Sequence, residues 1–238
     1  MINDANGVRA GWLCAAVMIS SAAHADGWSG KGEAGIVFAR GNSDTETANV
    51  KLEMAREIAR WKHGFGGSVL RAKNDGNKTA DRWGLFWQSD YKFSDRNYWF
   101  GALRYEDDRF SGFDYQSSAA TGLGHRFIDT ERTKLTGQAG VGYKRLKNAL
   151  TGATSDNAIV RGDVKYEHAL TGTTKIIDTF LVETGSANTF AVNELALQVK
   201  MSDAFALAVG VAVRHNTDPP NGLKKTDTLS TVNLVYGF

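Results

Sequence analysis

Residues 228–238 read TLSTVNLVYGF, and this stretch decides the fold class. Its largest apolar side chains recur at every second residue, at Val232, Leu234, Tyr236 and Phe238. A period of two is that of a β-strand with one apolar face. Because the alternation continues to the last residue, the C-terminus is expected to lie in a sheet rather than in a frayed polar tail.

The same alternation recurs from Trp28 onward, in about twelve segments that are separated by clusters of turn-forming residues. Clear examples are residues 47–54 (TANVKLEM), 158–169 (AIVRGDVKYEHA) and 205–215 (FALAVGVAVRH). The chain has 26 glycines and only 2 prolines, a balance typical of long strands that do not tolerate proline. The sequence therefore predicts an all-β protein of about twelve strands.

The predicted connections alternate in length. Longer connections, such as residues 107–114 and 216–227, alternate with short connections, such as residues 62–64 and 202–203. Barrels of bacterial outer membranes have long external loops at one end and short periplasmic turns at the other. This asymmetry favours a transmembrane, antiparallel, up-and-down β-barrel.

The first 25 residues have the features of a cleavable secretory signal, and residues 26–238 are expected to form one barrel domain. Arg9 precedes an apolar stretch, and Ala23-His24-Ala25 fits a cleavage site. The one cysteine, Cys14, falls within this signal, so the exported chain needs no disulfide. A formal net charge of +2 is too close to neutral to indicate a nucleic-acid partner.

A soluble barrel would show the same alternation with its faces exchanged. A closed sheet of about twelve strands, however, is too wide for aliphatic side chains to fill. The aromatic residues also gather near both ends of the predicted strands. Aromatic side chains are enriched at the two interfaces of a membrane, so this distribution favours a membrane barrel. The group at the short-turn end is Trp28, Trp61, Phe65, Tyr91, Phe93, Tyr98, Trp99, Phe127, Phe205, Tyr236 and Phe238, and the group at the loop end is Tyr105, Phe110, Phe113, Tyr115, Tyr143 and Phe190.

Leu234, Tyr236 and Phe238 resemble the C-terminal signal by which outer-membrane barrels are recognised for insertion. Asn233 departs from that pattern, which often has glycine at this place. The expected location is the cell outer membrane, and the expected partners are outer-membrane lipid, lipopolysaccharide and the barrel assembly machinery.

Three stretches carry a resemblance to a known family: GNSDTET at 41–47, YWFGALRYEDDRF at 98–110, and residues 216–238. With them the chain resembles the family of salt-induced outer membrane proteins, a domain family of unknown function. The resemblance implies an outer-membrane barrel with a link to salt or osmotic response, but no substrate and no catalytic residue. The family's loop features map onto Gly41, Asn42, Ser43, Asp44, Glu106, Asp107, Pro219, Pro220 and Asp227.

If the apolar faces meet lipid, the opposite faces line the lumen and carry both signs of charge. One interpretation is a water-filled pore for small polar solutes or ions; the other is a closed ionic core. Inward glycines, among them Gly122, Gly124, Gly140 and Gly142, either widen the lumen or sit beside bulky neighbours. The predicted lumen-lining residues are Lys51, Glu53, Arg82, Asp90, Lys92, Arg104, Glu106, Lys144, Arg161, Asp163, Lys165, Glu167, Glu194, Lys200, Arg214 and Asp227.

Catalysis finds little support in the sequence. A hydrolase at the loop end could use His215 with Asp107, Asp108, Asp114 and Asp218. A lipid-facing Ser–His pair would need His125 and Ser117, which lie about 26 Å apart along one strand, with no amide or acid placed to orient the ring. We expect no enzyme activity, no cofactor and no metal. The predicted function is a narrow channel, with a non-conducting structural barrel and a rim hydrolase as the alternatives.

Overall fold

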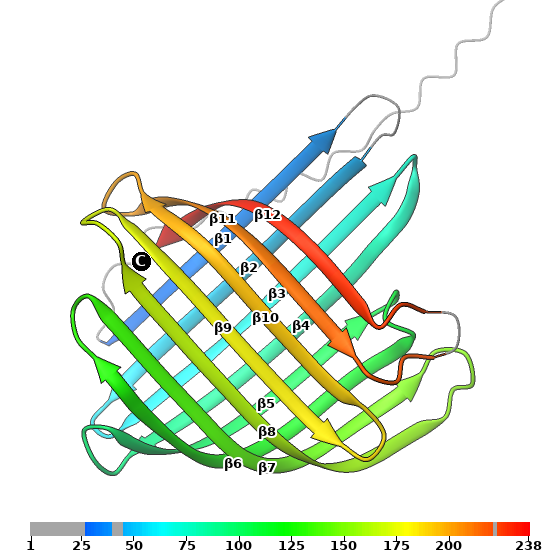
Figure 1. The fold of residues 1–238 in the computed structure, drawn as a ribbon, viewed down its shortest axis with the longest axis horizontal. Coiled ribbons are helices and arrows are strands. Elements are labelled where there is room, and N and C mark those ends of the chain that lie inside the picture. The colour runs from blue at the N-terminus through cyan, green and yellow to red at the C-terminus, as the bar shows by residue number, and fades with distance from the viewer. Residues whose placement is uncertain (1–26, 40–44, 221–222) are drawn as a thin grey trace, which may run out of the picture.

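The computed structural model describes residues 27–39, 45–220 and 223–238, which form one closed antiparallel β-barrel (Figure 1). Each strand pairs with its neighbours along the chain, and the first pairs with the last, so the predicted up-and-down barrel of twelve strands is confirmed. The strands are β1 (Trp28–Ala39), β2 (Thr45–Ile58), β3 (Trp61–Asn74), β4 (Asn77–Lys92), β5 (Asn97–Asp108), β6 (Phe113–Asp129), β7 (Thr133–Asn148), β8 (Thr154–Ala169), β9 (Thr174–Gly185), β10 (Thr189–Lys200), β11 (Phe205–Asn216) and β12 (Thr226–Gly237).

Some predictions lie outside the described residues: the signal at 1–25, and the family's loop residues Gly41, Asn42, Ser43 and Asp44. In the part of the chain that the structure describes, no helix is long and apolar enough to cross a membrane.

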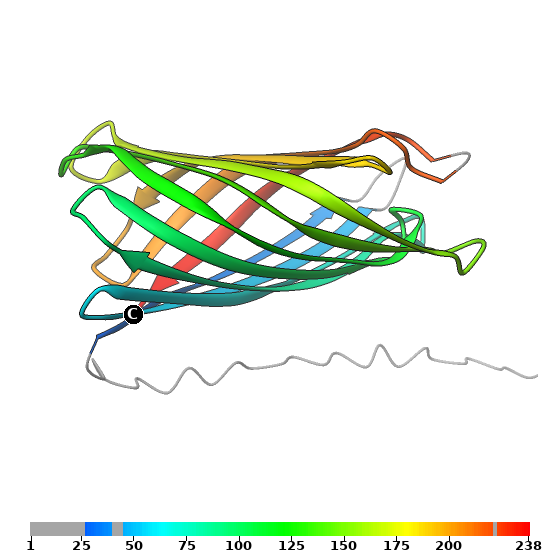
Figure 2. The ribbon, with the colours of Figure 1, turned by 90° about the horizontal axis from the view of Figure 1, so that it is seen from below.

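The connections at one end of the barrel are uniformly short, and those at the other end vary more in length (Figure 2). Residues 59–60 and 201–204 make tight turns at one end, whereas residues 149–153 and 217–225 connect strands at the other, the loop end. The connection between β3 and β4 also lies at the loop end, yet it is a two-residue turn, Asp75–Gly76. Both residues have a left-handed φ, of 48° and 78°, the conformation that Asp-Gly favours in a tight hairpin.

Contacts between strands that are not neighbours identify the inner face. Lys51 on β2 reaches Glu194 on β10, and Arg104 on β5 reaches Glu183 on β9. Such side chains can meet only through the interior of a closed barrel. Residues directly opposite each other in an antiparallel pair share a face, so the strand registers extend this assignment around the barrel.

The barrel is closed by a short seam between β1 and β12. The register runs from Lys31 opposite Gly237 to Ala34 opposite Leu234, four residue pairs, whereas β1 pairs with β2 over its whole length. The backbones of Gly30 and Phe238 add two hydrogen bonds, of 2.8 and 3.0 Å. The last residue of the chain therefore takes part in closing the barrel.

Aromatic side chains surround the outer wall, with three exceptions among those predicted. Tyr98, Phe113 and Phe190 lie near strand ends but are buried on the inner face, so they belong to the interior and not to the girdles. Their place near the strand ends was predicted correctly, but the face was not. On the outer wall, the guanidinium of Arg56 lies 5.5 Å from the centre of the Trp28 ring, which explains a cation on an otherwise apolar face.

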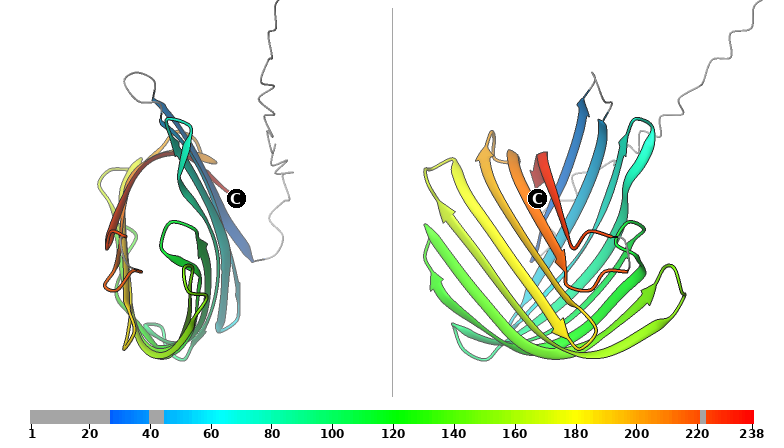
Figure 3. Two further views of the ribbon diagram at one scale, coloured as in Figure 1. Left: turned by 90° about the vertical axis from the view of Figure 1, so that its right-hand side faces the viewer. Right: turned by 45° about the vertical axis from the view of Figure 1, so that its right-hand side comes forward.

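The cross-section is flattened, with a tightly curved edge around β6 and β7 (Figure 3). The inward glycines follow from this curvature, because the backbones approach too closely for a side chain. A Cβ on Gly122 or Gly140 would collide with the opposite backbone, and one on Gly124 would collide with the Tyr98 ring. These glycines therefore accommodate the bend and the aromatic ring and do not widen the lumen.

Changing Gly124 to alanine is expected to lower the free energy of unfolding by about 1–3 kcal/mol, because the Tyr98 ring must move. Gly32→Ala is the matched control, since nothing lies within 4 Å of a Cβ at that position. Urea titration of the refolded barrel measures both. In a Tyr98→Ala background the Gly124→Ala change should cost less than in the wild type, because the ring is no longer there to be displaced. Equal effects of the two glycine changes would contradict this account.

Candidate functional site

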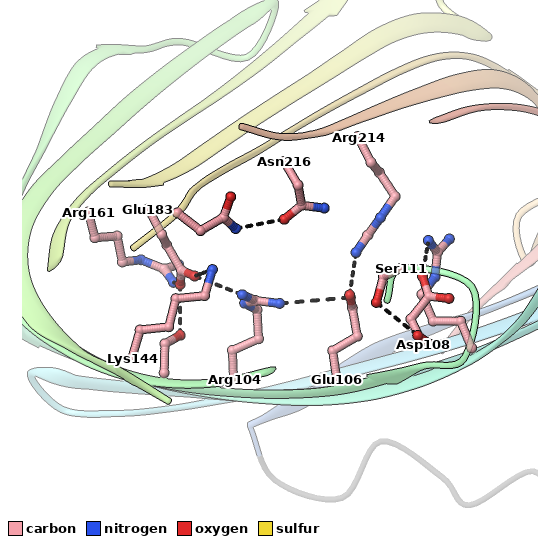
Figure 4. Close-up of polar contacts among 12 residues, drawn as sticks. Arg104, Glu106, Asp108, Ser111, Lys144, Arg161, Glu183, Arg214 and Asn216 are labelled. Carbon is pink, nitrogen blue, oxygen red and sulfur yellow. Dashed lines mark hydrogen bonds and ion pairs between the residues drawn. The ribbon is translucent and has the colours of Figure 1, made fainter. Parts of the chain in front are cut away.

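An ionic network fills the loop-end half of the barrel interior, and Glu183 lies at its centre (Figure 4). The carboxylate of this fully buried residue lies 2.7 Å from Arg104, 3.2 Å from Arg161 and 3.5 Å from Lys144. The hydroxyl of Ser118 donates a hydrogen bond of 2.7 Å to it. Three cations around one carboxylate leave this part of the interior positively charged.

A second carboxylate extends the network to the opposite wall. Glu106 on β5 lies 3.8 Å from Arg104 and forms an ion pair with Arg214 on β11. Because β5 and β11 are six strands apart in a ring of twelve, this contact spans the lumen. Nearby, Arg82 pairs with Asp108 at 3.4 Å. The flattened cross-section brings the two walls within reach of these side chains.

Phe190 is the apolar partner of these cations. Its ring is buried on the inner face of β10, and Arg104, Lys144 and Arg214 lie 4.6, 4.9 and 5.0 Å from its centre. Cations are attracted to the face of an aromatic ring, and more strongly where water is excluded. Phe190 therefore holds the basic side chains in place without neutralising them.

A separate cluster occupies the other side of the interior. Lys51 lies 3.1 Å from Glu53 and 3.2 Å from Glu194, while Lys31 lies 3.0 Å from both Glu33 and Glu53. The amides of Asn49 and Asn233 meet beside it, at 3.0 Å, and Asn233 donates to Glu33 at 3.3 Å. Asn233, which departs from the expected C-terminal signal, thus has a structural role inside the barrel.

Most of the remaining predicted lumen residues lie nearer the mouths, whereas Asp163 lies in the middle of β8 beside the network. Lys92 pairs with Glu57 at 2.7 Å, Lys165 with Glu167 at 2.8 Å, and Lys200 with Asp203 at 2.8 Å. Asp90 accepts a hydrogen bond from Gln88, Asp163 pairs with Arg161, and Asp227 lies exposed opposite Arg214. By strand register, all the residues predicted to line the lumen share the inner face.

Three cavities accompany these clusters. One of about 160 Å³ is lined by Lys51, Glu194, Arg82 and Arg214, among others. A second, of about 440 Å³, lies at the short-turn end beside Lys175 and Lys200 and extends to the turn residues there. A third, of about 420 Å³, lies at the loop end. The loop-end cavity is lined by Phe113, Leu146, Asn148, Leu150, Thr151, Ala153, Thr154, Ser155, Ala187, Asn188, Asp218, Pro219 and Pro220.

Sequence reasoning missed Glu183, the centre of the network. Its strand, β9, has apolar residues on both faces and an acid on each, since Asp178 shares the face of Ile176 and Phe180. No parity could be assigned from such a pattern. The register of β8 with β9, which places Glu183 opposite Arg161, supplies the missing information.

The groups proposed for a rim hydrolase do not form a catalytic set. Asp108, expected at the rim, faces the interior and pairs with Arg82. Asp114 lies 2.9 Å from Lys147, while His215 hydrogen-bonds Thr226. Across the described residues, no group of three or more His, Cys, Asp or Glu side chains is placed to hold a metal ion.

Histidines on the outer wall hydrogen-bond across strands. His125 lies 2.7 Å from the amide oxygen of Asn97, so an orienting amide exists where none was expected. His63 lies 2.7 Å from the Ser89 hydroxyl, and its ring stacks on Trp61. Ser89 and His63 are direct register partners, and the serine is buried. A half-buried pair of this kind without an orienting acid indicates strand pairing rather than nucleophilic chemistry.

Comparisons with known proteins agree with this architecture. The family described as "Protein of unknown function, DUF481" matches residues 32–238. "Uncharacterized protein YdiY" of Escherichia coli (strain K12) is 23% identical over 214 residues, which is 89% of this chain and 83% of the relative. Among solved structures, the NanC porin has a TM-score of 0.50 at 12% identity and covers 88% of this chain and 97% of its own.

The translocator domain of the autotransporter NalP from Neisseria meningitidis has a TM-score of 0.46 at 16% identity, with 90% of this chain and 89% of its own covered. These two solved structures are a porin and a translocator domain. At such low identity they show the fold alone.

Proposed function

Since the chain belongs to the DUF481 family, whose function is unknown, we propose from its interior that it is a narrow outer-membrane channel for small polar solutes or ions in a Gram-negative bacterium. The observation that carries the proposal is the charged inner face, with cavities on it of about 160 Å³ inside and about 440 Å³ at the short-turn end. A barrel that acted only through its lipid-facing outer wall would not need a charged inner face with cavities. The porin-like fold supports the same proposal.

The ionic network would be the constriction of this channel. Arg104, Glu106 and Glu183 project into the lumen from walls that the flattened barrel brings together (Figure 4). Fixed charges of both signs at a constriction select solutes by charge and size. Passage is then limited to ions and small polar molecules.

A non-conducting structural barrel is the second candidate, and one observation favours it. The contact between Arg214 and Glu106 ties opposite walls together, and the Phe190 ring is buried beneath it. A lumen bridged in this way can be a closed ionic core that stabilises the barrel. Conductance separates the two candidates.

The proposed partners are outer-membrane lipid, lipopolysaccharide and the barrel assembly machinery, with neither nucleic acid nor a cofactor. The link to salt or osmotic response stays a prediction that rests on the family resemblance. The absence of enzyme activity is likewise a prediction.

Planar-bilayer recordings of the refolded barrel test the channel. We expect small, discrete current steps, and opposite shifts in ion selectivity for two variants. Glu106→Ala leaves Arg104 and Arg214 without their shared carboxylate and should favour anions, whereas Arg161→Ala should favour cations. Asp203→Ala, in the exposed turn after β10, is the control. Folded protein that gives no current would support the structural barrel instead.

A further inference from the structure

Hydrogen-bond donors without partners gather at one level of the interior. Most of the buried polar side-chain atoms that lack a hydrogen bond among the described residues belong to Arg104, Gln116, Lys144 and Arg161. They are Arg104 Nε and Nη1, Lys144 Nζ, Arg161 Nε, and both polar atoms of the Gln116 side chain. All of these atoms except the Gln116 carbonyl oxygen are donors. Two of the donors lie near a carboxylate without a hydrogen bond to it, Lys144 Nζ at 3.5 Å from Glu183 and Arg104 Nη1 at 3.8 Å from Glu106. A buried donor without a hydrogen bond is costly, so this group favours an acceptor-rich occupant.

The strand registers place these residues side by side. Arg104 lies opposite Ser118 in the pairing of β5 with β6, and Ser118 lies opposite Lys144 in the pairing of β6 with β7. Gln116 is the next inward residue of β6, and its side chain is 1% exposed. Arg161 reaches the same place through Glu183, the carboxylate that it shares with Arg104 and Lys144. We call these residues, Arg104, Gln116, Lys144 and Arg161, the donor cluster.

The charges around the donor cluster determine the sign of its occupant. Among the described residues that ion pairs join into the network, five cations face four carboxylates, an excess of one positive charge. The cations are Arg82, Arg104, Lys144, Arg161 and Arg214, and the carboxylates are Glu106, Asp108, Asp163 and Glu183. A cation would meet like charge and no free acceptors except one amide oxygen. An anion is the occupant that satisfies both the charge and the donors.

Two cavities lie near the donor cluster, and each is lined by residues that neighbour it. The interior cavity of about 160 Å³ is lined by Arg82 and Arg214, the far end of the same network. At the loop end, the cavity of about 420 Å³ is lined by Leu146, which lies opposite Gln116 in the register of β6 with β7. Open space therefore lies close to the donor cluster, on the side of Arg214 and on the side of Leu146.

We infer that the donor cluster is a binding site for a small oxyanion, namely the carboxylate group of a small organic acid. The inference rests on the proposed channel function and adds that the solute of the channel is negatively charged. Arginine and lysine donors bind carboxylates through charge-assisted hydrogen bonds, and the Gln116 amide adds a neutral donor. The bound carboxylate would accept hydrogen bonds from those donor-cluster atoms that make none to Glu183.

Thermal unfolding of the barrel refolded in detergent tests the site, with sodium acetate as the probe and sodium chloride at equal ionic strength as the reference. Acetate should raise the unfolding temperature of the wild type more than chloride does. The acetate-specific increment should be lost in Lys144→Met and reduced in Gln116→Leu, with an apparent dissociation constant weakened roughly tenfold or more for the lysine. Met keeps the apolar stem beside Phe190, so the variant is expected to fold.

Lys200→Met is the control, because it removes the same charge at an exposed mouth position, where the lysine pairs with Asp203. It should keep the full acetate increment. If acetate and chloride act alike on the wild type, or if all variants respond equally, water occupies the donor cluster and the inference is wrong.

The binding result is independent of conductance. A barrel that conducts but shows no acetate-specific stabilisation retains the channel function and loses the oxyanion site. A barrel that binds acetate but carries no current retains the site and loses the channel function.

Discussion

Replacing Glu183 by glutamine is expected to lower the free energy of unfolding by about 3–5 kcal/mol, the usual cost of removing one partner from a buried ionic network. The amide keeps the size of the side chain and can still accept from the Ser118 hydroxyl. The amide has no negative charge to balance the positive charges of Arg104, Arg161 and Lys144. These three cations would then face one another without the central carboxylate. Urea titration of the refolded barrel, followed by heat-modifiability on gels, measures the loss.

The matched control is Asp203→Asn, which makes the same change of carboxylate to amide in an exposed ion pair with Lys200. Exposed pairs of this kind contribute little, because water and salt screen them. A loss for Glu183→Gln no larger than that of the control would show that the network is solvated. The closed-core alternative would then lose its main support.

Deleting Phe238 is expected to have the second large effect, a severe loss of folded barrel. The deletion removes both backbone hydrogen bonds to Gly30 from a seam with only four registered residue pairs. It also removes the ring that stacks on Tyr236, with ring centres 5.9 Å apart. In a bilayer an unpaired strand edge is more costly than in water, because no solvent replaces the lost hydrogen bonds.

Phe238→Ala separates the two roles of this residue, because it keeps the backbone and removes only the ring. If the ring is an assembly signal, this variant should refold in detergent in the absence of other proteins but reach the outer membrane poorly in cells. Yields of heat-modifiable barrel are compared in both settings. Normal yields of the deletion variant in cells would contradict the assembly role of Leu234, Tyr236 and Phe238.

Much of the architecture could be predicted from the sequence, because the information is local. A period of two indicates strands and divides each strand into two faces, as in residues 205–215. Alternation of connection lengths indicates an up-and-down barrel, and by register the charged residues of strands such as β2 and β8 share one face. Where one face is apolar and the other charged, the parity of a residue such as Arg161 or Lys51 is enough to place it on the inner face.

Local sequence patterns do not identify the inner face of a strand when its two faces carry similar residue types. Glu183 belongs to such a strand, and only its pairing with β8 and β10 places it opposite Arg161 and Phe190. Tyr98 shows the same limit, since an aromatic residue near a strand end can sit in the membrane girdle or fill the lumen above a glycine. In both cases the deciding neighbour is on another strand.

The sequence by itself determined the strand pattern, the class of barrel and the residues that share its inner face. Only the tertiary structure decided which charges meet across the lumen, because that depends on the shear and on the flattening of the cross-section, which arise from the whole sheet. The pairing of Arg214 with Glu106 from opposite walls, and the cations gathered on Phe190, are consequences of that shape. The sequence is thus enough to predict that the interior is charged, whereas the constriction of the lumen follows from the shape of the closed barrel.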